Sequence, residues 1–182
     1  MAAITRRQLV AATGLSMGGW MLNPIRVSAA AEDKGVTRLA SAIHQEPLID
    51  APPQRVYRAL MNSSQFDRIA GLSEAMQSAQ MQKLLPRHPS HIGQQEGEAF
   101  SLFGGYITGR QLRLVPNALI VQAWRAESWD PEDYSIARFE LKASESGTRI
   151  LFDHTGFPSA EAEHLAAGWY SNYWHPISKL LS

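Results

Sequence analysis

Hydrophobic and polar residues alternate along two neighbouring stretches near the middle of the chain, residues 107–115 and 119–125. A period of two is typical of a β-strand with one buried face, so both stretches are predicted to be strands. Pro116 and Asn117 lie between them and favour a turn, because proline fixes φ and asparagine tolerates left-handed backbone. The sequence therefore predicts a β-hairpin, with a further strand over residues 98–103 pairing on its other side.

The same alternation returns twice towards the C-terminus, at residues 134–141 and 148–155, with turn residues at 144–147 between them. An earlier strand is predicted over residues 42–50. Pro47 interrupts it and favours the edge of a sheet, because proline cannot donate a ladder hydrogen bond. The pattern predicts an antiparallel sheet that needs cover on one face.

Two short helices are predicted after the first strand, over residues 54–61 and 65–70. Asp50 is the expected cap of the first helix, and Asn62 begins the segment that recaps the second. Residues 73–83 are rich in helix formers and are predicted to be either a short helix or part of a long loop.

A long helix is predicted from Ser159, its expected N-cap, to residue 181. Pro176 is expected to kink this helix. Its apolar residues recur at helical spacing and form one stripe. The stripe comprises Leu165, Trp169, Tyr173, Ile177 and Leu180. The order of elements predicts an α+β fold.

Composition and charge exclude several kinds of site. The formal net charge is zero, which argues against a nucleic-acid partner, since such proteins normally carry a basic surplus. The chain has no cysteine, so disulfides, thiol catalysis and thiolate metal ligands are excluded.

The first 31 residues have the pattern of an export signal. Arg6 and Arg7 precede a glycine-broken apolar run, and small residues near Ala30 provide a cleavage site. Paired arginines favour the twin-arginine route, and the apolar run is too short for a membrane span. We therefore expect a signal over 1–31, a linker over 32–41 and one domain over 42–182, exported to the periplasm or beyond, with no stable membrane span after cleavage. A basic start on a cytosolic protein and an uncleaved anchor are the competing interpretations.

Several motifs give the chain a resemblance to a known family. They are Phe100-Ser-Leu-Phe-Gly-Gly, Thr108-Gly109, Leu114-Val-Pro, Ile120-Val-Gln-Ala-Trp-Arg125, Gly147-Thr148, His154 and Gly168-Trp169 to Tyr173-Trp174-x-Pro176. Together they resemble the START-like (birch-pollen-allergen-like, SRPBCC) superfamily, in the branch named for activators of the heat-shock chaperone ATPase. The resemblance implies a helix-grip fold, in which a curved antiparallel sheet wraps around the C-terminal helix. Export would separate this chain from cytosolic chaperone and ATP, so a chaperone partner is not expected.

The implied fold leaves a cavity between the sheet and the C-terminal helix. Strand parity gives the residues expected to face it. The expected ligand-binding residues are Phe100, Leu102, Leu112, Gln122, Trp124, Ala137, Phe139, Phe152, His154, Trp169 and Tyr173, with Leu114, Ile120, Ile150, Leu165 and Ile177 on the same faces. The competing interpretation is a solid core without a ligand, since large apolar residues are mostly just buried.

Gln122 and His154 are the polar members of this set, and each needs a partner because burying an unbonded polar group is costly. They could orient a polar atom of a ligand, with His154 as the candidate acid or base. They could equally bond each other, a helix hydroxyl such as that of Tyr173, or water. The sequence offers no second acid or base on the same face.

A metal site is a weak candidate. His88 and His91 stand near Glu96 and Glu98, but Pro89 places the histidines in a loop. Zinc sites usually show tighter ligand patterns, so we expect neither a metal nor another cofactor.

Three functions remain open. The first is an exported protein that binds a small apolar molecule in the cavity. The second is a cyclase- or dehydratase-like enzyme, which the resemblance implies for some relatives, with His154 as acid or base. The third is a protein-interaction module that uses Trp129, Tyr134 and residues 73–92 as its surface.

Overall fold

The computed structural model describes residues 41–77 and 88–182. The predicted export signal, almost all of the predicted linker and the middle of the 73–92 segment lie outside these residues. No helix among the described residues is both long and apolar enough to cross a membrane.

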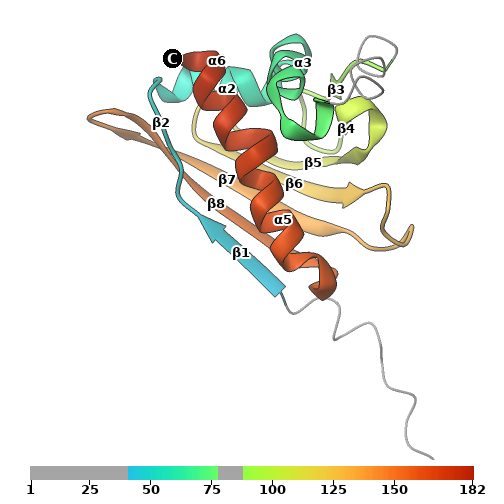
Figure 1. Cartoon of the computed structure of the whole chain (residues 1–182). Helices are drawn as coiled ribbons and strands as arrows, with labels where there is room; N and C mark the ends of the chain where they lie inside the picture. Colours follow the sequence, from blue (N-terminus) through green and yellow to red (C-terminus); the bar gives the residue numbers. More distant parts are fainter. Residues whose placement is uncertain (1–40, 78–87) are drawn as a thin grey trace, which may run out of the picture. The chain divides into compact units, whose positions relative to one another are not determined.

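One antiparallel sheet of eight strands forms the framework of the described residues, and the C-terminal helix lies across one face of it (Figure 1). The strands run in the order β1-β8-β7-β6-β5-β4-β3, and β2 pairs with β8 beside β1. Their bounds are β1 Ser41–Gln45, β2 Leu48–Ile49, β3 His91–Ile92, β4 Ala99–Leu102, β5 Ile107–Val115, β6 Leu119–Ala126, β7 Ser135–Ser144 and β8 Gly147–Phe157.

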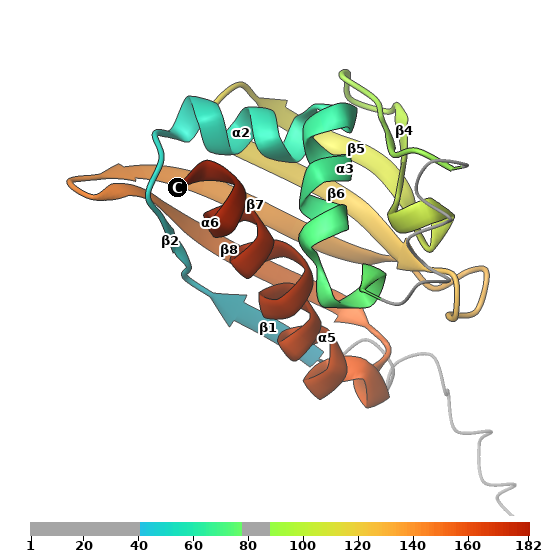
Figure 2. The ribbon, with the colours of Figure 1, turned by 45° about the horizontal axis from the view of Figure 1, so that its top comes forward.

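The helices cover the same face of the sheet (Figure 2). Two of them, α2 and α3, lie beside the last helix, α6. Their bounds are α2 Pro53–Met61, α3 Ser63–Leu72, α5 Ala162–Trp169 and α6 His175–Leu181. Four shorter helical turns complete the set: η1 Glu74–Met76, η2 Phe103–Gly105, η3 Ser159–Glu161 and η4 Tyr170–Trp174.

The predicted hairpin is confirmed as β5 and β6, and the predicted third strand is β4, paired with β5. Asn117 takes a φ of 64° in the connecting turn, the left-handed conformation that asparagine tolerates. Gly109 faces Phe100 across the β4–β5 pair. A Cβ at this glycine would collide with the carbonyl oxygen of Ala123 and with the Phe100 ring, so only glycine allows the ring to pack here.

The predicted first strand is present but divided in two. Pro47 separates β1 from β2, and its carbonyl accepts a hydrogen bond from the backbone N–H of Ile150 in β8. Strand β1 lies at an edge of the sheet, as the proline predicted.

One of the three predicted helix caps is confirmed. The Asn62 side chain accepts a hydrogen bond of 3.0 Å from the backbone N–H of Gln65 at the start of α3. Asp50 does not cap α2, because the N-cap position belongs to Pro52. Ser159 does not cap the C-terminal helix either, because a 3₁₀ turn, η3, begins at this residue and α5 follows it.

The predicted effect of Pro176 takes the form of a π-helical turn, η4, directly before α6. The backbone N–H of His175 donates to the carbonyl of Tyr170, five residues back. Proline has no N–H to donate and its ring crowds the carbonyl four residues before it, so the wider turn accommodates the break in the α-helical ladder.

A β-bulge in β5 turns Leu112 outward, so the prediction that this side chain faces the core is wrong. The register with β6 shifts between Gln111 and Arg113, which leaves Leu112 without a partner. Leu112 is therefore 45% exposed and does not face the core, whereas Gln111 is fully buried. An extra residue reverses the alternation along a strand, so parity counted from Leu114 gives the wrong face for residues before the bulge.

The bulge predicts unequal costs for two chemically identical substitutions. Leu112→Ala should change the free energy of unfolding by less than about 0.5 kcal/mol, as expected for an exposed site. Leu102→Ala, at a site 3% exposed on β4, should cost about 3 kcal/mol because it leaves a cavity in the core. Urea unfolding of both variants measures the difference, and equal losses would show that Leu112 points inward.

Candidate functional site

Aromatic side chains fill most of the space between the sheet and the C-terminal helix. Phe152 of β8 lies 4.3 Å from Trp169 and 5.2 Å from Trp174, measured between ring centroids. Phe139 of β7 lies 4.9 Å from Phe152. The solid-core interpretation therefore holds for this part of the interior.

Apart from Leu112, the residues predicted to face inward do so. Leu114 is partly buried against the core. The buried members are Phe100, Leu102, Ile120, Gln122, Trp124, Ala137, Phe139, Ile150, Phe152, His154, Leu165, Trp169, Tyr173 and Ile177.

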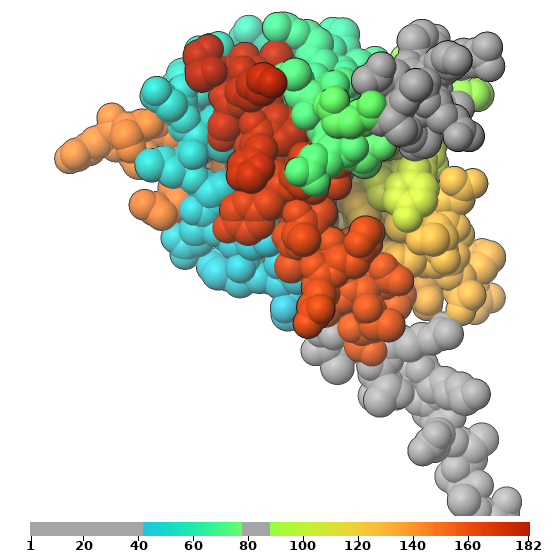
Figure 3. Space-filling view, in the orientation of Figure 1, coloured from blue at the N-terminus to red at the C-terminus, as the bar shows by residue number. Residues whose placement is uncertain are grey.

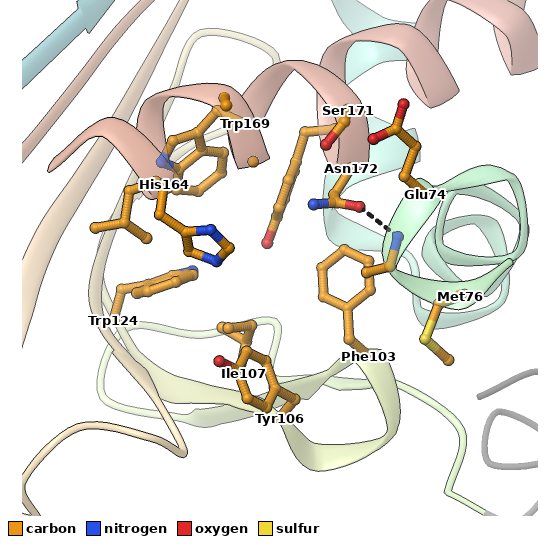
Figure 4. Close-up of a pocket in the computed structure, with 15 residues that line it drawn as sticks. Glu74, Met76, Phe103, Tyr106, Ile107, Trp124, His164, Trp169, Ser171 and Asn172 are labelled. Atoms are coloured by element: carbon orange, nitrogen blue, oxygen red, sulfur yellow. Dashed lines mark hydrogen bonds between the residues drawn. The ribbon is translucent and has the colours of Figure 1, made fainter. Parts of the chain in front are cut away.

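An open pocket of about 640 Å³ lies at one side of this core, under α5 and η4. Figure 3 shows the recess where α5 meets η1 and η2, and Figure 4 shows the side chains that line it. The lining residues are Glu74, Ala75, Met76, Phe103, Tyr106, Ile107, Trp124, His164, Leu165, Ala167, Gly168, Trp169, Ser171, Asn172 and Tyr173.

The sequence predicts only some of the residues that line this pocket. Trp124, Trp169 and Tyr173, all expected to bind a ligand, line it, and so does Leu165. The other expected ligand residues belong to the filled core or, for Leu112, to the surface. The missed wall comes from η1 and η2, two short turns whose side chains follow no strand or helix periodicity.

Phe103 of η2 has a strained backbone at the pocket. Its φ is 52°, in the left-handed region that phenylalanine rarely adopts. The ring packs edge-on against Phe66 at 5.4 Å and against Tyr173 at 5.5 Å. These two contacts hold the ring in place, and conformations that cost free energy persist where the surroundings fix them, often at ligand sites.

Asn172 links two segments of the pocket wall. Its side-chain oxygen accepts a hydrogen bond of 2.9 Å from the backbone N–H of Ala75 (Figure 4). The bond joins the π-helical turn η4 to η1, two segments far apart in the chain. Met76, which follows Ala75, is fully buried and lines the pocket.

His154 lies outside the pocket and has a partner for each ring nitrogen. Nδ1 accepts a hydrogen bond of 3.0 Å from the indole N–H of Trp169, and Nε2 lies 2.7 Å from the Ser135 hydroxyl. Burial lowers the pKa of His154 to about 3, so the ring is neutral. We assign the proton to Nε2, which donates to Ser135, and the Ser135 hydroxyl donates in turn to the carbonyl of Trp124. This complete network supports the structural interpretation of His154 over the acid–base one.

Gln122 also has a protein partner. Its amide N–H donates a hydrogen bond of 3.3 Å to the side-chain oxygen of Gln111, and the amide N–H of Gln111 donates to the carbonyl of Gly93 at 3.2 Å. Neither glutamine lines the pocket. The sequence could not predict this pair, because Gln111 faces inward only through the bulge.

Two polar atoms in the pocket wall have no hydrogen-bond partner among the described residues. They are the indole nitrogen of Trp124 and the hydroxyl of Tyr173, and both are buried. Burial raises the pKa of Tyr173 well above its usual value, and the nearby Trp124 indole N–H opposes this shift only in part. The hydroxyl is therefore neutral at physiological pH.

The candidate metal ligands do not converge. Within residues 41–77 and 88–182, no group of three or more histidine, aspartate or glutamate side chains is placed to hold a metal ion. Two of the candidate carboxylates instead bond backbone amides: Glu98 accepts from the N–H of Gln94, and Glu96 from the N–H of Leu114.

A curved antiparallel sheet that grips a C-terminal helix defines the START-like class of proteins. Within this class, residues 50–182 match the model of the family described as Activator of Hsp90 ATPase homolog 1-like protein, and the chain belongs to that family.

Relatives with curated names include activators of the 90 kDa heat shock protein ATPase. Homolog 2 of the mouse is 24% identical over 160 residues, which are 88% of this chain and 44% of the relative. The homolog of Dictyostelium discoideum is 35% identical over 90 residues, which are 48% of this chain and 23% of the relative. This chain thus spans less than half the length of these relatives.

Solved structures share the fold at low sequence identity. An HSP90 activator from Plasmodium falciparum has a TM-score of 0.60 at 22% identity, and the aligned region covers 79% of this chain and 96% of the activator's chain. An AHSA1-like protein from Aeromonas hydrophila has a TM-score of 0.58 at 14% identity, and the aligned region covers 77% of this chain and 91% of that protein's chain.

The buried neutral His154 predicts a loss of stability in acid. Its folded-state pKa of about 3 lies below the unfolded value of 6.5, so its contribution is present above pH 6.5 and is lost as the pH falls towards 3. By pH 5 the loss should reach about 2 kcal/mol, at roughly 1.4 kcal/mol per pKa unit.

Urea unfolding of the wild type and of His154→Gln between pH 7 and 5 measures this loss. The glutamine cannot titrate, so the variant should start less stable but lose less stability over this range. Parallel curves for the two proteins would contradict a buried neutral histidine.

Proposed function

We propose that this protein binds a small apolar molecule in the pocket beneath α5 and η4. The observation that supports the proposal is an open cavity of about 640 Å³ beside a core that aromatic side chains largely fill. Small-molecule sites typically have volumes of roughly 300–1,000 Å³ and mostly apolar walls with a few polar groups. Met76, Phe103, Ile107 and Trp169 give this pocket such walls.

Binding is better supported than catalysis. His154, the candidate acid or base, is held neutral by burial and lies outside the pocket. Apart from two tyrosines, the pocket is lined by two side chains that can ionise, those of Glu74 and His164, and both residues are exposed. Neither therefore has the desolvated surroundings that usually tune a general acid or base.

The interaction-module hypothesis loses one of its two aromatic residues. Trp129 is only 6% exposed and packs 5.3 Å from Trp124, whereas Tyr134 is 50% exposed. Chaperone ATPase activation is named for relatives of which the match covers less than half, and we do not extend it to this protein.

We also propose that the chain is exported by the twin-arginine route. The support is the order of Arg6 and Arg7, an apolar run and small residues up to Ala31. N-terminal sequencing of the protein recovered outside the cytoplasm tests this proposal. A chain that begins near Ala31 is expected, and a chain found only inside the cell with its first residues intact would contradict it.

Filling the pocket should weaken ligand binding without unfolding the protein. Gly168 lines the pocket within α5, and a Cβ there would meet only the Asn172 side chain at 3.7 Å, an ordinary contact. Gly168→Leu should lower the affinity for the fluorescent apolar probe N-phenyl-1-naphthylamine by about tenfold or more, because the leucine occupies the same space. Titration of the probe's fluorescence measures the affinity.

Gly71→Leu is the matched control. Gly71 also lies in a helix, α3, but a side chain there would enter open space away from the pocket. Leucine favours a helix more than glycine does, so both variants should keep the stability of the wild type. Equal probe affinity in all three proteins would show that the probe does not bind in this pocket.

A further inference from the structure

One buried indole N–H in the pocket wall, that of Trp124, lacks a hydrogen-bond acceptor within the described part of the chain. The indole N–H groups of two other buried tryptophans have acceptors: Trp169 donates to His154 at 3.0 Å, and Trp174 donates to Gln45 at 2.6 Å. The indole N–H of Trp124 has none among the described residues. Since buried polar groups are nearly always paired, this donor calls for an explanation.

A second polar group without a partner lies in the same wall. The Tyr173 hydroxyl has no hydrogen-bond partner among the described residues, and the Tyr173 side chain is 5% exposed. Ser90 has the third such atom in the described part of the chain, and this serine does not line the pocket. Two of the three exceptions therefore belong to one cavity.

The two groups face a common region. Trp124 and Tyr173 both pack against Trp169, with centroid distances of 5.7 and 4.3 Å. The indole N–H of Trp124 is near enough to the Tyr173 hydroxyl to affect its pKa, although the geometry is not that of a hydrogen bond. In Figure 4 the nitrogen-bearing edge of Trp124 points towards the open centre of the pocket.

The chemistry of these groups defines what they can bind. An indole N–H can only donate a hydrogen bond, and a neutral phenol can donate one as well. No described residue that lines the pocket is a lysine or arginine, and its two other ionisable side chains besides the tyrosines, those of Glu74 and His164, are exposed. A ligand with a negative charge would lose its hydration without gaining a lysine or arginine partner, so the site favours a neutral acceptor.

We propose that the ligand is a neutral, largely apolar molecule with a carbonyl oxygen, which accepts hydrogen bonds from the Trp124 indole N–H and the Tyr173 hydroxyl. A carbonyl oxygen has two lone pairs and can accept both bonds. The remaining walls, including Phe103 and Ile107, then contact its hydrocarbon frame. This inference rests on the proposed function and specifies the class of ligand.

Fluorenone and fluorene test the inference, because they share one flat ring frame and differ chiefly in a carbonyl oxygen. Each compound is titrated against bound N-phenyl-1-naphthylamine in the wild type and in Tyr173→Phe, which removes only the hydroxyl. The variant should bind fluorenone about tenfold more weakly and fluorene with unchanged affinity, since one hydrogen bond contributes about that factor. Tyr134→Phe is the control, because Tyr134 is 50% exposed and does not line the pocket; it should change neither affinity.

Each outcome has a distinct meaning. Equal losses for both compounds would show that the hydroxyl matters only for packing, and unchanged affinities would show that it contacts no carbonyl; either overturns the inference and leaves apolar binding intact. A wild type that binds neither the probe nor the two compounds would overturn the proposed function itself.

Infrared spectroscopy supplies a readout that does not depend on affinity. The carbonyl stretch of bound fluorenone should lie at lower frequency than in an alkane solvent, because hydrogen bonding weakens the C=O bond. The shift should shrink in Tyr173→Phe and persist in Tyr134→Phe. A bound carbonyl with the alkane frequency in the wild type would contradict the two donors.

Discussion

The packing of Trp169 against the sheet decides how space is used beneath the C-terminal helix. Its ring lies 4.3 Å from Phe152 on one side and 4.3 Å from Tyr173 on the other, and its N–H bonds His154 at 3.0 Å. The indole therefore forms the boundary between a filled core, which joins helix and sheet, and the open pocket. Because its N–H needs an acceptor, the buried neutral His154 and the Ser135 hydroxyl behind it follow from the same contact.

The C-terminal helix meets two different requirements along its length. Around Trp174 and Ile177 it buries apolar side chains completely, as a core helix does. At η4 it widens into a π turn before Pro176, and Tyr173 and Asn172 of this turn reach the pocket. Single π turns of this kind often occur at functional sites, because the extra residue redirects side chains without ending the helix.

Much of the framework could be predicted from the sequence, because burial on one face of a strand leaves an alternation that is visible in the residues. Alternation in β6 and β8 correctly placed Gln122, Trp124, Phe152 and His154 inside. It failed at Leu112, since a bulge is a property of the pairing between two strands and leaves no mark in the residues of one.

The position of the pocket was beyond sequence reasoning for a related reason. The wall that the sequence did not predict consists of η1 and η2. These turns have three residues each and are held by single contacts, such as the hydrogen bond between Asn172 and Ala75. A turn of three residues has no periodicity to interpret. Sequence parity also could not separate the residues that fill the core from those that border open space, because both groups are apolar and buried.

Native mass spectrometry of the protein as isolated tests the central claim, that the pocket holds a small molecule, most directly. The account predicts a reproducible extra mass that is absent from the denatured wild type and from native Gly168→Leu, but present on native Gly71→Leu. A wild-type protein that shows only its bare mass, and gains none when incubated with N-phenyl-1-naphthylamine or fluorenone, would contradict the claim.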